Sequence, residues 1–322
     1  MEENVLVIKH GALGDFVMAS GRMLTVRRRH PGAHVALVTE RFLAALAKSM
    51  GIFDEIVEDS RGYSFATWWR VIKRTIADRR WDAIYDLQSS NRTLCRYYPL
   101  ALLATGNAMR WGRLAKGGLV WRENTRKAPF LPWFWRSRFE AVEWLPRDLS
   151  MCHGARENFS LLPPRYALVI PGCSAGNERK RWPADRYRAL TAEFAKRGLK
   201  SVVLGTKAER AEIEAICNGN PDAIDFMGKS AIEDIPDLAN GAEVVVGNDT
   251  GPTHIAQIAG ARTVLVFADS DYARAAPKGA QNATSLHGPS VSDVPLSDVV
   301  AAACGALPGG EALNNAVKEA GT

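Results

Sequence analysis

The stretch YALVIPGCSAGNERKRWPADRY (166–187) decides the fold of the second half of the chain. Its first five residues form a short apolar run that is typical of a buried strand. A glycine-containing loop follows, and a helix is expected to start near Ala184. A buried strand that leads through such a loop into a helix is the building unit of parallel sheets covered by helices. The stretch therefore predicts an α/β fold.

The same order of strand, loop and helix recurs along the chain. In the first half, strands are predicted at 5–8, 34–38, 55–57 and 83–87, with helices near 15–29, 40–49 and 65–79. In the second half, strands are predicted at 166–170, 201–205, 243–247 and 263–267, with helices near 184–197, 207–217, 231–239 and 252–260. Two such series predict two Rossmann-like domains with parallel sheets.

The domain boundary is expected where two adjacent prolines, Pro163 and Pro164, interrupt regular structure. This placement gives an N-terminal domain of residues 1–160 and a C-terminal domain of residues 161–322. The length of 322 residues is about twice that of a typical single domain. The stretch 118–147 is expected to be irregular, and the last residues of the chain are expected to be loosely held.

Composition excludes several classes of protein. The apolar fraction of 47% and the charged fraction of 24% are those of an ordinary globular chain and argue against disorder. The five cysteines are scattered without a Cys-x-x-Cys pair, which favours free thiols in a reducing compartment over a zinc site. The opening MEENVLVIKHG has no signal-peptide pattern, and no run approaches the ~18 apolar residues of a membrane span. We expect a cytoplasmic protein.

Charge is distributed unevenly between the two halves. Residues 1–160 hold 25 Lys and Arg against 16 Asp and Glu, whereas residues 161–322 hold 16 against 19. Eight of the nine tryptophans also lie in the first half. A basic, Trp-rich half indicates an anionic partner such as a phosphorylated glycolipid, a membrane surface or nucleic acid. A basic surface that simply faces solvent explains the charge equally well.

The loop after the first strand, KHGALGDF (9–16), carries the first candidate site. Gly11 and Gly14 are expected to bracket a tight turn, with Asp15 where a helix begins. A dinucleotide fingerprint would need a third glycine, and Asp15 would repel a pyrophosphate. Two interpretations of Asp15 remain at this point, a helix N-cap or a catalytic carboxylate.

Two further loops of the second half are suited to phosphate. The loop PGCSAGNERKRWP (171–183) carries three consecutive cations around Lys180 at the end of a strand. The loop GNDTGPTH (247–254) follows another strand, and Thr250, Gly251 and Pro252 are expected to start a helix whose free N–H groups face an anion. Asp249 beside that anion is expected to accept hydrogen bonds from sugar hydroxyls. His254, in the same first turn, is either a structural residue or part of the site.

These three motifs, V-I-K-H-G-A-L-G-D, K-R-W-P and D-T-G-P-T-H, together resemble glycosyltransferase family 9, which contains the ADP-heptose:lipopolysaccharide heptosyltransferases. Their order and separation match over residues 4–275. The resemblance implies a GT-B fold, in which two Rossmann-like domains face each other across a cleft. It also implies an inverting, metal-independent transfer without a cofactor, from a nucleotide-sugar donor to a glycolipid or phosphorylated glycan.

The resemblance also implies roles for single residues. Asp15 would be the general base. It would lie on the acceptor side, in the loop that contains Gly11 and Gly14. Lys180 would neutralise the diphosphate, helped by the amides around Thr250 and Gly251. Asp249 and His254 would line the donor pocket, with Ser174 as a lesser phosphate contact. No D-x-D metal motif is present in the sequence.

The chain departs from the family pattern after the strand at 263–267. Members commonly carry G-P-T-D-P there, whereas this chain has ADSDY (268–272) and keeps only Asp271. This departure bears on the identity of the donor. A second region, 121–146, interleaves cations with Trp133, Phe134 and Trp135. It is expected either to contact the inner membrane or an acceptor phosphate, or to fill the core.

Four other functions compete with a transferase. A nicotinamide oxidoreductase would explain the Rossmann-like units but neither the broken fingerprint nor the two phosphate loops. A related nucleotide-sugar epimerase or a non-catalytic sugar-nucleotide binding protein would share the fold. Nucleic-acid binding rests only on the basic first half, and no recognition motif supports it.

Overall fold

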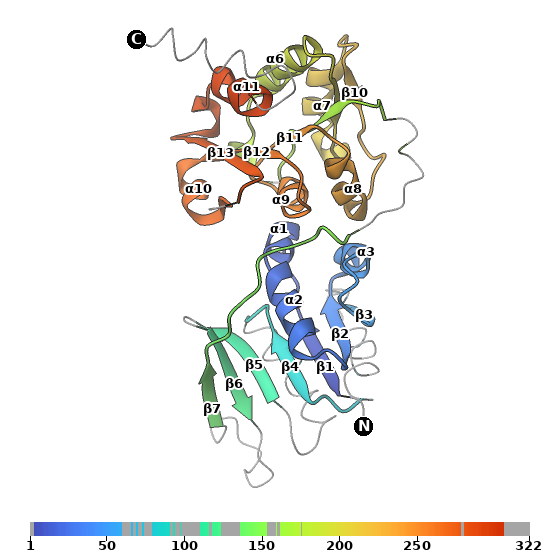
Figure 1. Cartoon of the computed structure of the whole chain (residues 1–322), viewed down its shortest axis with the longest axis vertical. Coiled ribbons are helices and arrows are strands. Elements are labelled where there is room, and N and C mark those ends of the chain that lie inside the picture. Colours follow the sequence, from blue (N-terminus) through green and yellow to red (C-terminus); the bar gives the residue numbers. More distant parts are fainter. Residues whose placement is uncertain are drawn as a thin grey trace. The chain divides into compact units, whose positions relative to one another are not determined.

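The computed structural model describes two compact units, Met1–Asp148 and Leu149–Thr322 (Figure 1). The described residues are 3–59, 79–90, 110–115, 118–123, 136–152, 162–174, 176–277 and 280–305, together with Ala66, Trp69, Lys73, Thr93, Tyr97 and Phe159. The units divide at 148/149, about a dozen residues before the boundary expected at 160/161.

The N-terminal unit is built on a seven-stranded sheet with the order β3-β2-β1-β4-β5-β6-β7. Its strands are β1 (Asn4–Ile8), β2 (His34–Thr39), β3 (Glu55–Glu58), β4 (Ala83–Asp86), β5 (Arg110–Ala115), β6 (Gly118–Glu123) and β7 (Arg136–Glu140). Its helices are α1 (Leu13–Val17), α2 (Ser20–Arg29) and α3 (Arg41–Ser49). The strands from β3 to β5 are parallel, whereas β6 and β7 pair in antiparallel fashion at one edge.

The expectation of an irregular stretch at 118–147 is therefore wrong for residues 118–123 and 136–140, and this sheet is not purely parallel. Strands β6 and β7 were not predicted, because their sequences GLVWRE and RSRFE are rich in Trp and Arg. The alternation is nevertheless present in β6, where Leu119 and Trp121 are buried and Val120 between them is less so. The single helix expected at 15–29 is two helices, α1 and α2, and most of the helix expected at 65–79 lies outside the described residues.

The C-terminal unit is built on a six-stranded, fully parallel sheet with the order β10-β9-β8-β11-β12-β13. Its strands are β8 (Tyr166–Ile170), β9 (Lys200–Val203), β10 (Ala223–Asp225), β11 (Val244–Asn248), β12 (Thr263–Ala268) and β13 (Ala283–Gly288). Its α-helices are α6 (Ala184–Ala195), α7 (Arg210–Cys217), α8 (Ile235–Asn240), α9 (Gly251–Ile258), α10 (Asp269–Ala275) and α11 (Leu296–Cys304). Short 3₁₀ turns are η4 (Glu178–Lys180), η5 (Lys207–Glu209), η6 (Ile232–Asp234) and η7 (Val291–Asp293).

Side chains from alternate strand positions build the core of this unit on both faces of the sheet. Ala167 and Val169 of β8 face one cluster, which also contains Tyr187 and Phe194 of α6 together with residues of α7 and α11. Leu265 of β12 points to the opposite face, where it packs beside α10. Strands buried on both faces must be apolar at every position, and this explains the continuous apolar runs in the sequence.

Candidate functional site

The parallel sheet of the C-terminal unit has one point at which its strand order reverses. The chain passes from β8 to β9 and β10 on one side, then returns to β11 on the other side of β8 and continues outward. At such a switch point the loops that follow the two central strands diverge and leave a crevice where ligands bind. Here these loops are residues 171–183 after β8 and residues 249–250 after β11.

Asn248, the last residue of β11, forms hydrogen bonds with both ends of the first of these loops. Its buried amide nitrogen Nδ2 donates to the carbonyl oxygens of Pro171 (2.6 Å) and Gly172 (3.3 Å). Its Oδ1 accepts from the Trp182 backbone N–H (3.0 Å) and from the Tyr187 hydroxyl (2.9 Å). One side chain therefore holds both ends of the loop 171–183. Sequence reasoning gave Asn248 no role, although it directly precedes Asp249 in the D-T-G-P-T-H motif.

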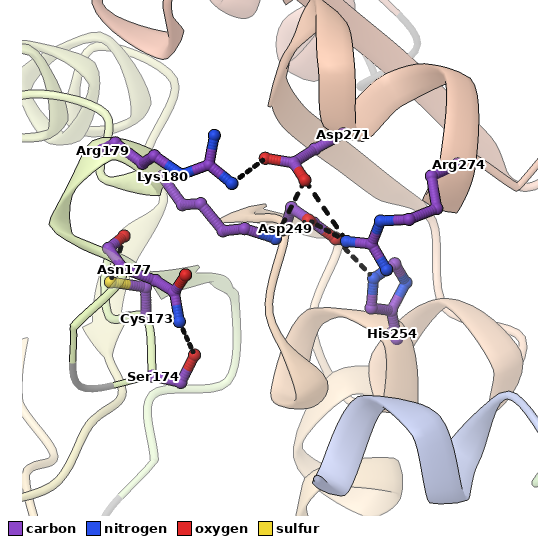
Figure 2. Close-up of polar contacts among 9 residues, drawn as sticks. All are labelled: Cys173, Ser174, Asn177, Arg179, Lys180, Asp249, His254, Asp271 and Arg274. Atoms are coloured by element: carbon purple, nitrogen blue, oxygen red, sulfur yellow. Dashed lines mark hydrogen bonds and ion pairs between the residues drawn. The ribbon is translucent and has the colours of Figure 1, made fainter.

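Lys180 lies at the centre of a charged cluster at this crevice (Figure 2). Its ammonium group forms an ion pair with Asp249 and lies 3.4 Å from Oδ1 of Asp271. Only 12% of the Lys180 side chain is exposed. The fold thus brings together two residues singled out in the sequence, Lys180 and Asp249, that are 69 positions apart.

His254 contacts the same carboxylate from the first turns of α9. Its Nε2 lies 2.9 Å from Oδ1 of Asp249, and both side chains are buried. Burial of Asp249 acts to raise the pKa of its carboxyl group, but the hydrogen bonds from His254 and Lys180 outweigh burial and hold that pKa below its ordinary value. Asp249 is therefore a carboxylate that is anchored on both of its oxygens.

The start of α9 is close to the prediction. Thr250 is the N-cap residue, and Gly251 and Pro252 are the first two helical residues. Pro252 occupies the second helical position, one residue later than expected. The Thr250 hydroxyl makes no capping hydrogen bond, so it does not compete for the N–H groups of the first turn. Those groups remain suited to an anionic ligand.

The three consecutive cations of the loop 171–183 do not act as one phosphate cluster. They fall around the 3₁₀ turn η4, whose successive side chains point in different directions. Arg181 turns away to pair with Glu212 and Cys173, whereas Arg179 lies 3.8 Å from Asp271. Of the three, only Lys180 contacts Asp249. Ser174 is exposed, and its hydroxyl accepts a hydrogen bond from the Asn177 side chain (3.0 Å).

Helix α10 adds two residues that sequence reasoning gave no role. Asp271 is buried, with a side chain that is 7% exposed, and Arg274 lies one helical turn further on. Arg274 Nη2 lies 3.3 Å from Asp271 Oδ1 and 3.6 Å from Asp249 Oδ2. The only signal in the sequence is the spacing of three between Asp271 and Arg274, which places both on one face of a helix.

The N-terminal unit has its own switch point, between β1 and β4. The loops that diverge there follow Ile8 and Asp86. Gln88 joins them, because its Oε1 accepts from the Lys9 ammonium group (3.0 Å) and from the His10 backbone N–H (3.2 Å). Lys9 is buried, and burial lowers the pKa of its ammonium group.

The positions of the two glycines near this crevice differ. Gly11 has a φ of +115°, a conformation that favours glycine, and its N–H donates to Glu40 (3.3 Å). Gly14 instead lies in the first turn of α1, with open space where a side chain would be. The expectation of a turn bracketed by two glycines therefore holds for Gly11 alone.

Asp15 is an exposed residue of α1. The N-cap of this helix is Ala12, and no side chain caps it. The interpretation of Asp15 as a helix N-cap is therefore wrong, because the helix begins at Leu13, three residues earlier than that interpretation requires. The carboxylate lies at the edge of the sheet where β1 ends, in the unit that does not contain Lys180.

Across the described ranges, no group of three or more His, Cys, Asp or Glu side chains is arranged to hold a metal ion. No helix in the described part of the chain is long and apolar enough to cross a membrane.

Comparison with known proteins assigns the chain to a class. Its structure is similar to E. coli ADP-heptose lps heptosyltransferase II, with a TM-score of 0.69, 18% identity and coverage of 94% of this chain and 97% of that chain. It is also similar to the glycosyltransferase family 9 protein from Veillonella parvula DSM 2008, with a TM-score of 0.71, 17% identity and coverage of 94% and 96%. A third similar structure is E. coli heptosyltransferase WaaC with ADP-2-deoxy-2-fluoro heptose, with a TM-score of 0.64, 15% identity and coverage of 92% and 97%. No curated protein sequence matches the chain.

These likenesses confirm the GT-B fold, with two Rossmann-like units. The class of protein is therefore a GT-B glycosyltransferase. More particularly, residues 145–292 match the model of glycosyltransferase family 9 (heptosyltransferase), and this part of the chain belongs to that family. The matched range contains both loops of the charged crevice. The resemblance predicted from the motifs is confirmed.

Proposed function

We propose that the protein transfers a heptose from ADP-heptose to a hydroxyl group of the lipopolysaccharide core or a related cell-surface glycan. The observation that carries this proposal is the cluster of Lys180, Asp249 and His254 at the switch point of the family 9 domain. The solved structures that share the fold include proteins named for ADP-heptose. An anion-binding helix start and a buried ammonium group suit the diphosphate of such a donor.

The proposed reaction is a single displacement that inverts the anomeric carbon. Asp15 takes the proton from the acceptor hydroxyl, and the acceptor oxygen forms a bond to the anomeric carbon. The bond from that carbon to the β-phosphate oxygen breaks, and its electron pair leaves with the nucleoside diphosphate. Lys180 and the amides of Thr250 and Gly251 meet the resulting charge. Asp249 accepts hydrogen bonds from the sugar hydroxyls.

No metal ion or other cofactor takes part in this proposal, because cations of the chain itself meet the phosphate charge. Turnover should therefore be unchanged by a chelator such as EDTA. A strict requirement for Mg²⁺ would contradict the mechanism. Ser174 is proposed as a further phosphate contact, with Asn177 holding its hydroxyl.

The proposed acceptor is a glycolipid or a phosphorylated glycan reached from the cytoplasmic side, with peripheral contact to the inner membrane. Its support is the basic charge of the first 160 residues. Most of the Trp-rich segment that suggested this contact, residues 124–135, lies outside the described residues. The described Trp121 is buried, and its indole N–H donates to Glu140, so this aromatic residue belongs to the core.

A nucleotide screen followed by a turnover assay tests the proposal. Calorimetric titration with ADP, UDP, GDP and NAD⁺ should give the tightest binding for ADP. Incubation with ADP-heptose and a heptose-deficient core acceptor should then release ADP and extend the glycan. Preference for UDP with interconversion of UDP-sugars would instead indicate an epimerase. Binding of ADP-heptose without transfer to any acceptor would indicate a non-catalytic relative.

A further inference from the structure

The segment in which this chain departs from its family forms the helix α10. Where family members commonly carry G-P-T-D-P, residues 268–272 read ADSDY. The second proline of that pattern corresponds to Tyr272, the fourth residue of α10. A proline at this position would remove the N–H group that closes the first turn of an α-helix. Tyr272 keeps this N–H group, and the helix runs to Ala275 with Arg274 in its last turn.

Two residues of this segment, Asp269 and Tyr272, hold α10 against the neighbouring strand β13. His287 of β13 lies 2.7 Å from the Asp269 carboxylate through its Nδ1. The His287 ring also stacks on Tyr272, with ring centroids 4.0 Å apart and planes inclined by 25°. Tyr272 also forms a T-shaped pair with the buried Phe267 ring, with ring centroids 6.0 Å apart. These contacts set the orientation of the helix and hence the face that carries Asp271 and Arg274.

Arg274 and Lys180 contact the same two carboxylates but differ greatly in exposure. Lys180 is 12% exposed and lies between Asp249 and Asp271, whereas 63% of the Arg274 side chain is exposed (Figure 2). The contacts of Arg274, at 3.3 and 3.6 Å, are also longer than those of a tight bidentate pair. Arg274 is therefore the more mobile of the two cations and can exchange a carboxylate for a phosphate at little cost.

The charges of this cluster do not balance. Lys180, Arg179 and Arg274 are three basic side chains, whereas Asp249 and Asp271 are the two carboxylates that they contact. The excess of positive charge favours an anionic ligand at this place.

We propose that Arg274 binds the β-phosphate of the donor and stabilises the charge that appears on this phosphate when the sugar leaves. This role rests on the proposed function, because it concerns the same diphosphate. The sugar–oxygen bond breaks heterolytically, its electron pair stays on the β-phosphate oxygen, and the nucleoside diphosphate leaves with one more negative charge than it carried in the donor. Lys180 meets the charge that is already present, and Arg274 leaves Asp249 and Asp271 to meet the charge that develops.

The proposal is tested by comparing the binding of ADP with that of AMP, which lacks the β-phosphate. In calorimetric titrations, Arg274→Ala should lower the affinity for ADP about tenfold or more, as expected for one charge-assisted hydrogen bond, and leave the affinity for AMP unchanged. Arg274→Lys should retain part of the affinity for ADP. Because Arg274 is exposed, both variants should keep the wild-type melting temperature. The matched control is Arg210→Ala, which removes an exposed arginine paired with Glu214 in the same unit.

The outcomes separate this proposal from the function on which it rests. Equal ADP affinity in wild type and Arg274→Ala would overturn the role of Arg274 and leave the transferase untouched. An equal loss for ADP and AMP would also overturn it, because Arg274 would then act by positioning Asp249 or α10. If the wild-type protein bound no nucleoside diphosphate, the proposed function would fail, and the role of Arg274 would fail with it.

Discussion

Each unit has a crevice at the point where the strand order of its sheet reverses, but the side chains that line the two crevices differ. In the N-terminal unit, the loops after β1 and β4 are joined by Gln88, and the nearest cation, Lys9, is buried against it. The exposed group there is the carboxylate of Asp15. In the C-terminal unit, carboxylates are buried and cations surround them.

This difference separates what the fold provides from what the side chains provide. Strand order determines where a crevice opens, because loops diverge wherever the order reverses. The residues at the strand ends determine which ligand fits. An exposed carboxylate suits the removal of a proton from a hydroxyl group, whereas a cationic cluster suits a diphosphate. The comparison therefore predicts that substitutions in the two crevices affect different steps.

The largest effect is expected at Asp15. Asp15→Asn should lower kcat by roughly 10²–10⁴-fold, because the general base is lost while the size of the side chain is kept. Donor affinity should stay unchanged, since the donor is assigned to the other unit. Steady-state kinetics with separate titrations of donor and acceptor measure both quantities.

Asp185→Asn is the matched control for this substitution, since Asp185 is likewise an exposed aspartate in the first turn of a helix. Wild-type turnover by Asp15→Asn would remove the catalytic role and with it the contrast between the crevices.

A smaller, different effect is expected at Lys180. Lys180→Ala should weaken ADP binding and lower kcat/KM by about 10- to 100-fold, because a charge-assisted contact to phosphate is lost. Acceptor affinity should not change. Calorimetric titration with ADP measures the first effect, and Lys196→Ala, which removes an exposed lysine paired with Glu193, serves as control. If the ADP affinity were unchanged, Lys180 would have no role in phosphate binding, and its contact with Asp249 would be a structural ion pair only.

The framework of the C-terminal crevice depends on Asn248. Asn248→Ala should lower the free energy of unfolding by about 2–4 kcal/mol, because four hydrogen bonds are lost and buried partners are left unsatisfied. Urea denaturation followed by far-UV circular dichroism measures this loss. The exposed Asn240, at the end of α8, gives the control Asn240→Ala. A loss of stability no larger than in that control would show that the loop 171–183 is held by other contacts.

The smallest effect concerns the response to acid. The pKa of Asp249 is lower in the folded protein than its ordinary value of 3.8, so the folded state binds this proton more weakly than the unfolded state does. The resulting stabilisation is complete above the unfolded pKa and is lost as the pH falls below it toward the folded pKa. The difference in melting temperature between wild type and Asp249→Asn should therefore be constant near neutral pH and shrink below about pH 4. A difference that stays constant down to pH 3 would contradict the shift.

Some elements could be predicted because local sequence is sufficient for them. The central strands β1, β8, β11 and β12 are apolar on both faces, and a continuous apolar run carries that information by itself. Five strands were missed, namely β5, β6, β7, β10 and β13. The sequences RWGRLA, GLVWRE, RSRFE and ATSLHG are largely polar or carry bulky aromatics, and β10 has only three residues. These segments form strands because they pair with a neighbouring strand, and the local sequence does not show that this neighbour is present.

By itself, the sequence determined the fold class, the central strands of both sheets and the motif residues from which the family was inferred. These depend on periodicity and on residue types at short spacing. Only the tertiary structure decided that Asn248 joins both ends of the loop 171–183, that Arg181 turns away from Lys180, and that Arg274 reaches the carboxylates of Asp249 and Asp271. The physical reason is that the contacts of a side chain depend on which strand ends become neighbours, and strand order is a property of the whole sheet.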